Sequence, residues 1–209
     1  MTTRLRFTGH IAGVGTGSGT RLVVGRWAGS PYGSFADVMV ERPDGHRVLL
    51  APTEEVAGFV AATYAFDEVR VVPVGVTPSW PTGAVRVPTW RVSAGPLELD
   101  LEVGGRTPLG WLLRAVPAPV ATAPLWLGLI DPLARRLQRG VRTSGSAGGG
   151  RHEWYGARDV HRVVRVAARW EGADLGGLAP VDPPVRFGAG STPRRPVVVA
   201  VTTTVASPR

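Results

Sequence analysis

Short segments in which apolar and polar residues alternate make up most of this chain. In the clearest segment one face carries Leu97, Leu99, Leu101 and Val103, and the other carries Glu98, Asp100 and Glu102. A period of two is that of a β-strand with one buried face. Turns rich in glycine and proline separate it from similar segments at residues 4–12, 20–27, 35–41, 46–51, 68–76, 152–170 and 196–205. The pattern predicts a mostly antiparallel β-sheet, in which the β-branched run 196–205 suits a central strand.

Two segments have helical features instead. Thr53 is a suitable N-cap and two glutamates follow it, where the helix dipole favours negative charge. One helix face would then carry Val56, Phe59, Val60 and Thr63. These features predict a helix near 53–64, and residues 109–138 resemble broken helices. The predicted fold class is therefore α+β: a single domain, residues 1–209, whose sheet is closed into a barrel or cone. An open sheet with helices on one face is the alternative.

Composition excludes several classes of chemistry. The chain has no cysteine, and its 24 lysine and arginine residues are all arginine. Disulfides, thiolate nucleophiles, Schiff bases and a phosphate-loop lysine are therefore impossible. The net charge of +8 raises nucleic acid as a partner, but the arginines are not interleaved with aromatic residues, so we do not favour it.

Other common motifs are absent or incomplete. The run GVGTGSG at 13–19 leads into a predicted strand rather than a helix, which indicates a hairpin turn and not a dinucleotide site. Ser146 lacks the glycine that a hydrolase elbow requires. Four histidines form no metal-ligand spacing, although His152 and Glu153 with His161 are a weak arrangement of that kind. We predict no cofactor and no metal.

Targeting features are also lacking. The first residues have no apolar core of a secretory signal, and residues 109–130 contain Arg114 and three prolines. A membrane-spanning helix is therefore not expected, and the predicted location is cytoplasmic.

Residues 151–161 form the richest polar segment. Glu153, Asp159 or either histidine is a candidate for acid–base chemistry, and a strand end with structural ion pairs is the alternative. Alternation counted back from Trp170 places Trp154 and Arg158 inside the fold, unless Gly156 carries a bulge. The same count places Arg165 and Arg169 outside, where we expect them to face the acidic side of 97–103.

Asp37 lies in a segment that is apolar on both faces, FADVMVE at 35–41. A buried carboxylate is either paired with an arginine or has a raised pKa. Pairing is the favoured prediction, with Arg26, Arg47 or Arg158 as the partner.

Several short pieces resemble the acetoacetate decarboxylase-like superfamily. They are Ser30-Pro31-Tyr32-Gly33 before a strand, a Glu-x-x-Gly motif at 153–156, and Trp170-Glu171-Gly172 with Leu175. The resemblance implies a β-cone around an apolar cavity, although the glutamate motif comes later here than in the family. It does not imply decarboxylation, because Arg158 stands where a catalytic lysine would be needed and arginine forms no imine.

Three functions compete at this point. The leading one is a soluble, cofactor-free protein that binds a small, mainly apolar or anionic molecule in an internal cavity; Arg158 would contact the anion, with walls from Trp27, Tyr32, Trp154 and Tyr155. The second is a lyase, isomerase or cyclase in the same cavity, with Glu153 or Asp37 as base and Arg158 as electrophilic stabiliser. The third is a structural or membrane-surface protein that uses residues 109–130 and the basic residues 135–142. Whether the protein is an enzyme and its oligomeric state stay open.

Overall fold

The structure is a computed structural model that describes residues 3–79, 88–123, 127, 143–146, 148–188 and 190–207. Within these ranges ten strands form one continuous path, in the order β5-β4-β3-β2-β1-β13-β10-β8-β7-β6. Their bounds are β1 Thr3–Thr16, β2 Arg21–Gly29, β3 Phe35–Glu41, β4 Arg47–Ala51, β5 Glu68–Val71, β6 Val74–Ser79, β7 Thr89–Ala94, β8 Leu97–Arg106, β10 His152–Trp170 and β13 Val197–Ser207. Three short strands pair at the margins: β9 (Ser144–Ser146), β11 (Ala173–Asp174) and β12 (Leu178–Ala179).

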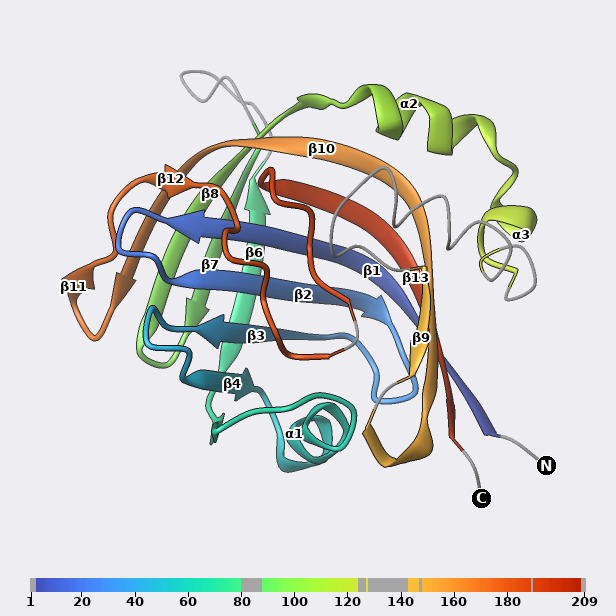
Figure 1. The fold of residues 1–209 in the computed structure, drawn as a ribbon, viewed down its shortest axis with the longest axis horizontal. Helices are drawn as coiled ribbons and strands as arrows, with labels where there is room; N and C mark the ends of the chain where they lie inside the picture. The colour runs from blue at the N-terminus through green and yellow to red at the C-terminus, as the bar shows by residue number, and fades with distance from the viewer. Residues whose placement is uncertain are drawn as a thin grey trace.

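The sheet is mostly antiparallel, with β4 and β5 as a parallel pair, and it curls into an open half-barrel. In Figure 1 the long strand β10 arcs over the top of the molecule and down its right side. β13 lies between β1 and β10, which confirms the central strand predicted for residues 196–205. The predicted α+β class and curled sheet are confirmed, with one difference: the strand path ends at β5 and β6 and leaves the half-barrel open.

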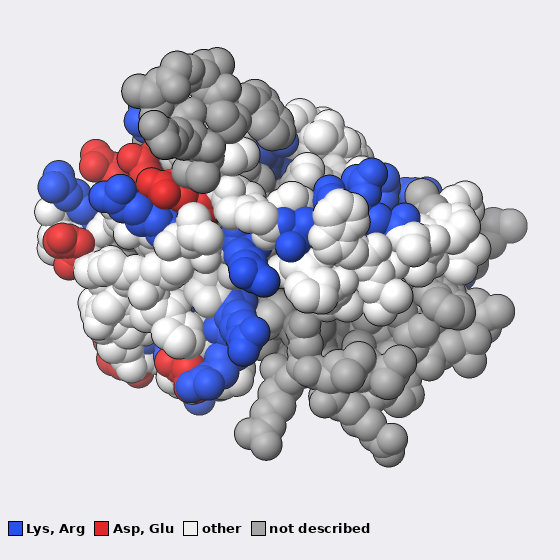
Figure 2. Space-filling view, turned by 90° about the horizontal axis from the view of Figure 1, so that it is seen from above, with Lys and Arg blue, Asp and Glu red and all other residues white. Residues whose placement is uncertain are grey.

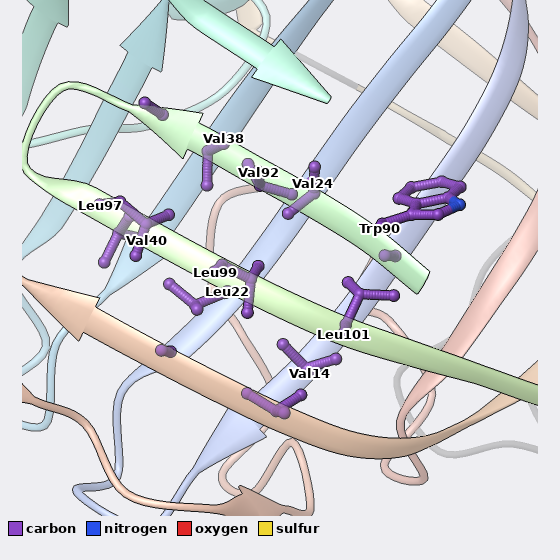
Figure 3. Close-up of a cluster of buried hydrophobic side chains, with 14 of the residues drawn as sticks. Val14, Leu22, Val24, Val38, Val40, Trp90, Val92, Leu97, Leu99 and Leu101 are labelled. Atoms are coloured by element: carbon purple, nitrogen blue, oxygen red, sulfur yellow. The ribbon is translucent and has the colours of Figure 1, made fainter. Parts of the chain in front are cut away.

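The main core fills the space between β1–β4 and β6–β8, which cross behind them in Figure 1. Figure 3 shows the side chains that meet there, including Val14 from β1, Leu22 from β2 and Leu99 from β8. Alternate residues of β8 from Leu97 to Val103 are buried, as the sequence pattern predicts. Burial of this apolar surface is the main favourable contribution to folding.

The opposite face of β2–β4 is covered by other elements. Helix α1 (Glu54–Ala61) packs there against Leu49 and Ala51, and the backbone N–H of Val56 donates to the Oγ1 of Thr53 at 3.2 Å. The segment 181–187 packs on the same face. The helix predicted near 53–64 and its N-cap are therefore confirmed.

The predicted helical insertion near 109–138 is described over its first part only. Helices α2 (Pro108–Ala115) and α3 (Ala118–Ala121) occupy that part, and α2 packs against β10. Residues 124–126 and 128–142, which include the basic residues 135–142, lie outside the described residues. A 3₁₀ turn, η1, follows at Gly148–Gly150. No helix of the described part has the length and apolarity needed to cross a bilayer.

The side-chain alternation of β10 changes along its length. Ala157 pairs with Val201 and Asp159 with Ala200, so Arg158 is an extra residue in a β-bulge. Arg158 is exposed, and the prediction that it faces the interior is wrong because this bulge reverses the count. Further register shifts against β8 leave Val164 50% exposed and bury Val163 in its place.

The predicted contact between the arginines of β10 and the acidic face of β8 is confirmed. Arg165 lies opposite Glu102, with 3.5 Å between Nη1 and Oε1, and Arg169 lies opposite Glu98. Pairs of this kind near the surface contribute only about 0.2–1 kcal/mol each. Figure 2, which views the molecule from above, shows the basic side chains as a band with carboxylates gathered toward one side.

Candidate functional site

A cavity of about 1030 Å³ lies on the face of β1–β3 and β13 that is turned away from the main core. The first half of β10 continues its floor, and α1, the start of α2 and residues from 185–188 and 190–196 surround it. Its volume is at the upper end of the range for sites that hold small molecules, roughly 300–1,000 Å³. The fold thus provides a space large enough for a ligand beside a separately packed core.

The floor of the cavity is apolar because alternate residues of each strand point into it. Aliphatic contributions come from Ile11, Val23, Met39, Val199, Val201 and Val205. Aromatic rings crowd one end, where Phe7 lies 5.1 Å from Phe59 and 5.8 Å from Trp27, measured between ring centroids. Such walls favour a ligand with a large apolar surface.

Asp37 on β3 is the first polar group of this cavity. It is 3% exposed, and its Oδ1 accepts a hydrogen bond from Trp27 Nε1 at 2.9 Å. Burial raises the pKa of Asp37 to about 7, and the Trp27 hydrogen bond acts in the opposite direction. Within the described ranges no arginine bonds to Asp37, so the predicted ion pair is wrong and the alternative, a raised pKa, applies.

Gly25 makes room for this pair. It lies directly opposite Asp37 across β2 and β3. A Cβ at this position would be 2.4 Å from Asp37 Oδ1 and 2.7 Å from Trp27 Nε1. The two side chains therefore fold over a strand position that only glycine can occupy without displacing them.

Glu153 on β10 is the second buried carboxyl, at 5% exposure. Its Oε1 lies 2.8 Å from Tyr64 Oη and its Oε2 lies 3.0 Å from Tyr155 Oη. The two phenol oxygens are 2.5 Å apart. These three groups form a closed ring of hydrogen bonds, which we call the Tyr–Glu–Tyr ring.

The environment of the Tyr–Glu–Tyr ring favours neutral groups. Burial raises the pKa of Glu153, while the two phenols and Arg151 act in the opposite direction. Burial also raises the pKa of Tyr64 and of Tyr155 well above the usual range, and the charge of Asp37 contributes to the shift at Tyr155. That last effect links the ring electrostatically to the other carboxyl of the cavity.

Thr203 on β13 adds a polar atom without a partner. It pairs with Tyr155 across the two strands, lines the cavity and is 4% exposed. Its Oγ1 is buried and makes no hydrogen bond in the described structure. A buried hydroxyl without a partner costs roughly 1–3 kcal/mol, so a polar ligand group that reached Thr203 Oγ1 would be favourable.

The arginines of the cavity lie at its rim. Arg162, Arg194 and Arg195 contribute to the lining but are exposed. Arg194 is held by Asp182 at 2.7 Å. Within the described residues no arginine bonds to either carboxyl. Arg151, which acts to lower the pKa of Glu153, donates to the backbone oxygen of Phe59 and to Thr63 Oγ1.

The structure brings together four of the seven residues selected from the sequence. Asp37, Glu153, Trp27 and Tyr155 all line the cavity. The other three residues do not line the cavity. Arg158 is exposed in its bulge, and Trp154 points away from the cavity beside His152. Tyr32 packs on Phe7 and Phe59 outside the lining. Trp154 faces outward for the same reason that Arg158 does.

Two groups of the site were missed. Tyr64 follows Val56 and Val60 at intervals of four, which is the spacing of one helix face. Thr203 interrupts an apolar row of alternate residues in β13. Both patterns are visible in the sequence, but neither shows which cavity the residue enters.

The remaining polar residues of segment 151–161 have structural roles. Asp159 bonds to Arg106 at 2.7 Å and lies 3.5 Å from His161. His152 contacts Ser144 at 2.8 Å. The described residues contain no cluster of three or more histidine, aspartate or glutamate side chains suited to a metal ion. The ion-pair interpretation thus fits this part of the segment, whereas Glu153 belongs to the cavity.

Comparison of the chain with protein-family models, curated proteins and solved structures yields no match. The geometry of the cavity is therefore the basis for a functional proposal.

Proposed function

We propose that this protein binds a small, mainly apolar molecule in the cavity, with one polar end directed toward the two carboxyls. The observation that carries the proposal is the unpartnered, buried Oγ1 of Thr203, which lies opposite Tyr155 in a cavity whose walls are mainly apolar. A polar ligand atom there would supply the missing hydrogen bond. The apolar part of the ligand would cover the aliphatic floor.

A neutral ligand fits the inner end better than an anion. Asp37 and Glu153 have no described cationic partner in hydrogen-bond contact, and the apolar surroundings of the cavity disfavour a buried negative charge that no cation pairs. The expected anion contact, Arg158, lies outside the cavity. We therefore retain the apolar ligand and drop the anionic one.

Two fluorescent probes that differ by one charge test this proposal. N-Phenyl-1-naphthylamine is neutral, and 1-anilinonaphthalene-8-sulfonate carries a sulfonate on the same aromatic framework. We expect the full-length protein to bind the neutral probe more tightly. Native mass spectrometry of the purified protein provides a second test, because a bound apolar molecule would add its mass to that of the chain.

A pair of variants on β10 locates the binding. Ala157 lines the cavity and Ala167 is exposed on the same strand. Ala157→Trp should place an indole ring in the cavity and weaken binding of the neutral probe, whereas Ala167→Trp should leave it unchanged. Equal binding by both variants would disprove binding in the cavity.

The cavity also bears on the resemblance to the acetoacetate decarboxylase-like superfamily. A curled, mostly antiparallel sheet and a glutamate of the Glu-x-x-Gly motif in an apolar cavity support a common architecture. The absence of lysine from the sequence argues against the imine chemistry of that family. We therefore propose the shared architecture without the shared reaction.

Contact with a membrane surface is a second candidate function, favoured by one observation. Trp111 and Leu112 on α2 are 63% and 66% exposed, beside Arg114 in the same helix. Exposed apolar side chains next to a cation are typical of interfacial helices. Binding to vesicles of phosphatidylcholine and phosphatidylglycerol should then weaken with salt and be lost in Trp111→Ser/Leu112→Ser. Binding that is unaffected by both changes would contradict this role.

A further inference from the structure

The Tyr–Glu–Tyr ring requires a proton on its carboxyl group. Three pairs of oxygens are in contact in the ring, at 2.8, 3.0 and 2.5 Å, and each hydrogen bond needs one proton. The phenols of Tyr64 and Tyr155 supply only one proton each. An ionised Glu153 would leave one contact as two lone pairs facing each other. The third proton therefore belongs to Glu153, in agreement with the effect of burial on its pKa.

Asp37 has a different environment in the same cavity. Its only described hydrogen bond comes from Trp27 to Oδ1, and nothing in the described structure donates to Oδ2. Among the described residues, no phenol or second carboxyl shares a proton with it. It therefore has an oxygen available to accept a proton from a bound molecule.

Two carboxyls in one apolar cavity are thus set up for opposite roles. One is free to take a proton, and the other is held protonated together with two phenols. In an apolar site, a protonated carboxyl and a phenol can donate hydrogen bonds to a carbonyl oxygen on which negative charge develops, while an aspartate acts as the base. Ketosteroid isomerase is the general precedent for this pairing of acid and base.

We infer that this cavity catalyses proton transfer at the carbon next to the carbonyl group of an apolar ketone, with Asp37 as base and the Tyr–Glu–Tyr ring as donor to the carbonyl oxygen. This inference rests on the proposed function, since the ketone is the apolar molecule with one polar end.

The step balances without any further reactant. Asp37 takes the proton as the C–H bond breaks, and that electron pair forms a C=C bond. The π electrons of the carbonyl group move to its oxygen. All three protons of the Tyr–Glu–Tyr ring are used in its internal contacts, so one ring hydroxyl gives up its acceptor within the ring and donates to this oxygen instead. Asp37 then returns the proton to the same carbon or to a conjugated one, and the product is an exchanged or isomerised ketone.

The position of Thr203 is consistent with this geometry. Its unpartnered Oγ1 lies on the strand next to Tyr155, at the end of the cavity where the ring donors lie. It can donate a second hydrogen bond to the same carbonyl oxygen. A carbonyl oxygen has two lone pairs, so it can accept from both groups.

Hydrogen–deuterium exchange of 2-tetralone, an apolar ketone with acidic C–H groups, tests the inference. The exchange is measured by proton NMR in deuterium oxide near neutral pH. The full-length protein should accelerate loss of the signal from the protons on the carbon next to the carbonyl group. Displacement of N-phenyl-1-naphthylamine measures binding of the ketone separately. Buffer alone gives the background rate.

Three variants assign the roles. Asp37→Asn should lower the protein-catalysed exchange rate by about 100-fold or more. Tyr155→Phe should lower it by about 100-fold, because it removes one donor to the oxygen on which charge develops. Asp100→Asn changes an aspartate of β8 that lies away from the cavity and should leave the rate unchanged. Retained binding of the neutral probe shows that each variant is folded.

Each other outcome has a distinct meaning. If 2-tetralone displaces the probe but exchanges at the buffer rate, the proton-transfer inference is wrong and ligand binding stands. If the neutral probe binds and 2-tetralone does not displace it, the ketone is the wrong class of ligand. If Asp37→Asn exchanges as fast as the native protein, Asp37 is not the base. If the neutral probe itself does not bind, the proposed function fails as well.

Discussion

Burial of Asp37 without a cationic partner makes the stability of the fold depend on pH. Its pKa rises from an ordinary 3.8 to about 7 in the folded chain. Between these values the native state holds a proton that the unfolded state has released, so the free energy of unfolding falls as pH rises. The difference between 3.8 and about 7 corresponds to at most about 4 kcal/mol.

Asp37→Asn removes this titration while it keeps the shape of the side chain. We expect its stability relative to the native protein to increase between pH 4 and pH 8, measured by urea unfolding at each pH. Asp67→Asn is the control, because Arg47 lowers the pKa of Asp67 to about 2 and its titration lies below this window. A constant difference for Asp37→Asn across the window would show that Asp37 is ionised throughout.

Gly25 offers a second test of the same pair. Gly25→Ala brings a Cβ within 2.4 Å of Asp37 Oδ1, so the Trp27–Asp37 hydrogen bond must shift. We expect a loss of roughly 1–3 kcal/mol, measured by chemical unfolding, because a buried carboxyl loses its donor.

Gly75→Ala is the matched control for that change. Gly75 is also a strand glycine, on β6, but nothing lies within 4 Å of a Cβ there. Alanine should be neutral or slightly stabilising at this position. A similar loss at both positions would mean that Gly25 has no special role beside Asp37.

At the level of single residues, the sequence predicts that Asp37 is buried but not that Trp27 is its hydrogen-bond donor. The apolar surroundings of Asp37 show that it is buried, and FADVMVE suffices for that. Trp27 is the donor because of the strand register. Gly25 pairs with Asp37 and Trp27 pairs with Phe35, so the side chains of Trp27 and Asp37 are diagonal neighbours on one face. That register depends on the turn at 30–34, whose geometry residue types do not specify.

At the scale of elements, most strands and the first helix follow from local patterns. Alternation in 97–103 and the Thr53 N-cap are local properties, and both are confirmed. The residues of β10 that point inward do not follow from its own sequence, because the bulge at Arg158 is defined by the pairing of β10 with β13. This one extra residue explains why Arg158 and Trp154 were placed in the cavity from the sequence and lie outside it in the structure.

The pairing of β10 with β8 allows a prediction for the two elements. Arg165 and Glu102 are directly opposed, and Arg165 is exposed while Glu102 is half-buried, so their coupling energy should be about 0.2–1 kcal/mol and decrease with salt. A double-mutant cycle with Arg165→Ala and Glu102→Ala measures it. A coupling energy of several kcal/mol would require a desolvated pair, which the exposure of Arg165 excludes.

At the scale of the whole molecule, the two faces of β13 border two different environments. One face enters the well-packed core between β1–β4 and β6–β8, and the other lines the cavity. Hydrophobic burial in the core stabilises one face of the sheet, and the other face borders the cavity. The sequence predicted a curled sheet and a cavity, but not that the cavity lies outside the main core.

Two valines of β13 distinguish these environments with the same substitution. Val198 is 5% exposed in the core and Val201 is 4% exposed at the cavity. Val198→Ala leaves a new void and should lower the free energy of unfolding by about 2 kcal/mol, whereas Val201→Ala only enlarges existing space and should cost about half as much. Urea unfolding measures both. Equal losses would mean that the space beside Val201 is as tightly packed as the core, and the ligand-binding proposal would then lose its physical basis.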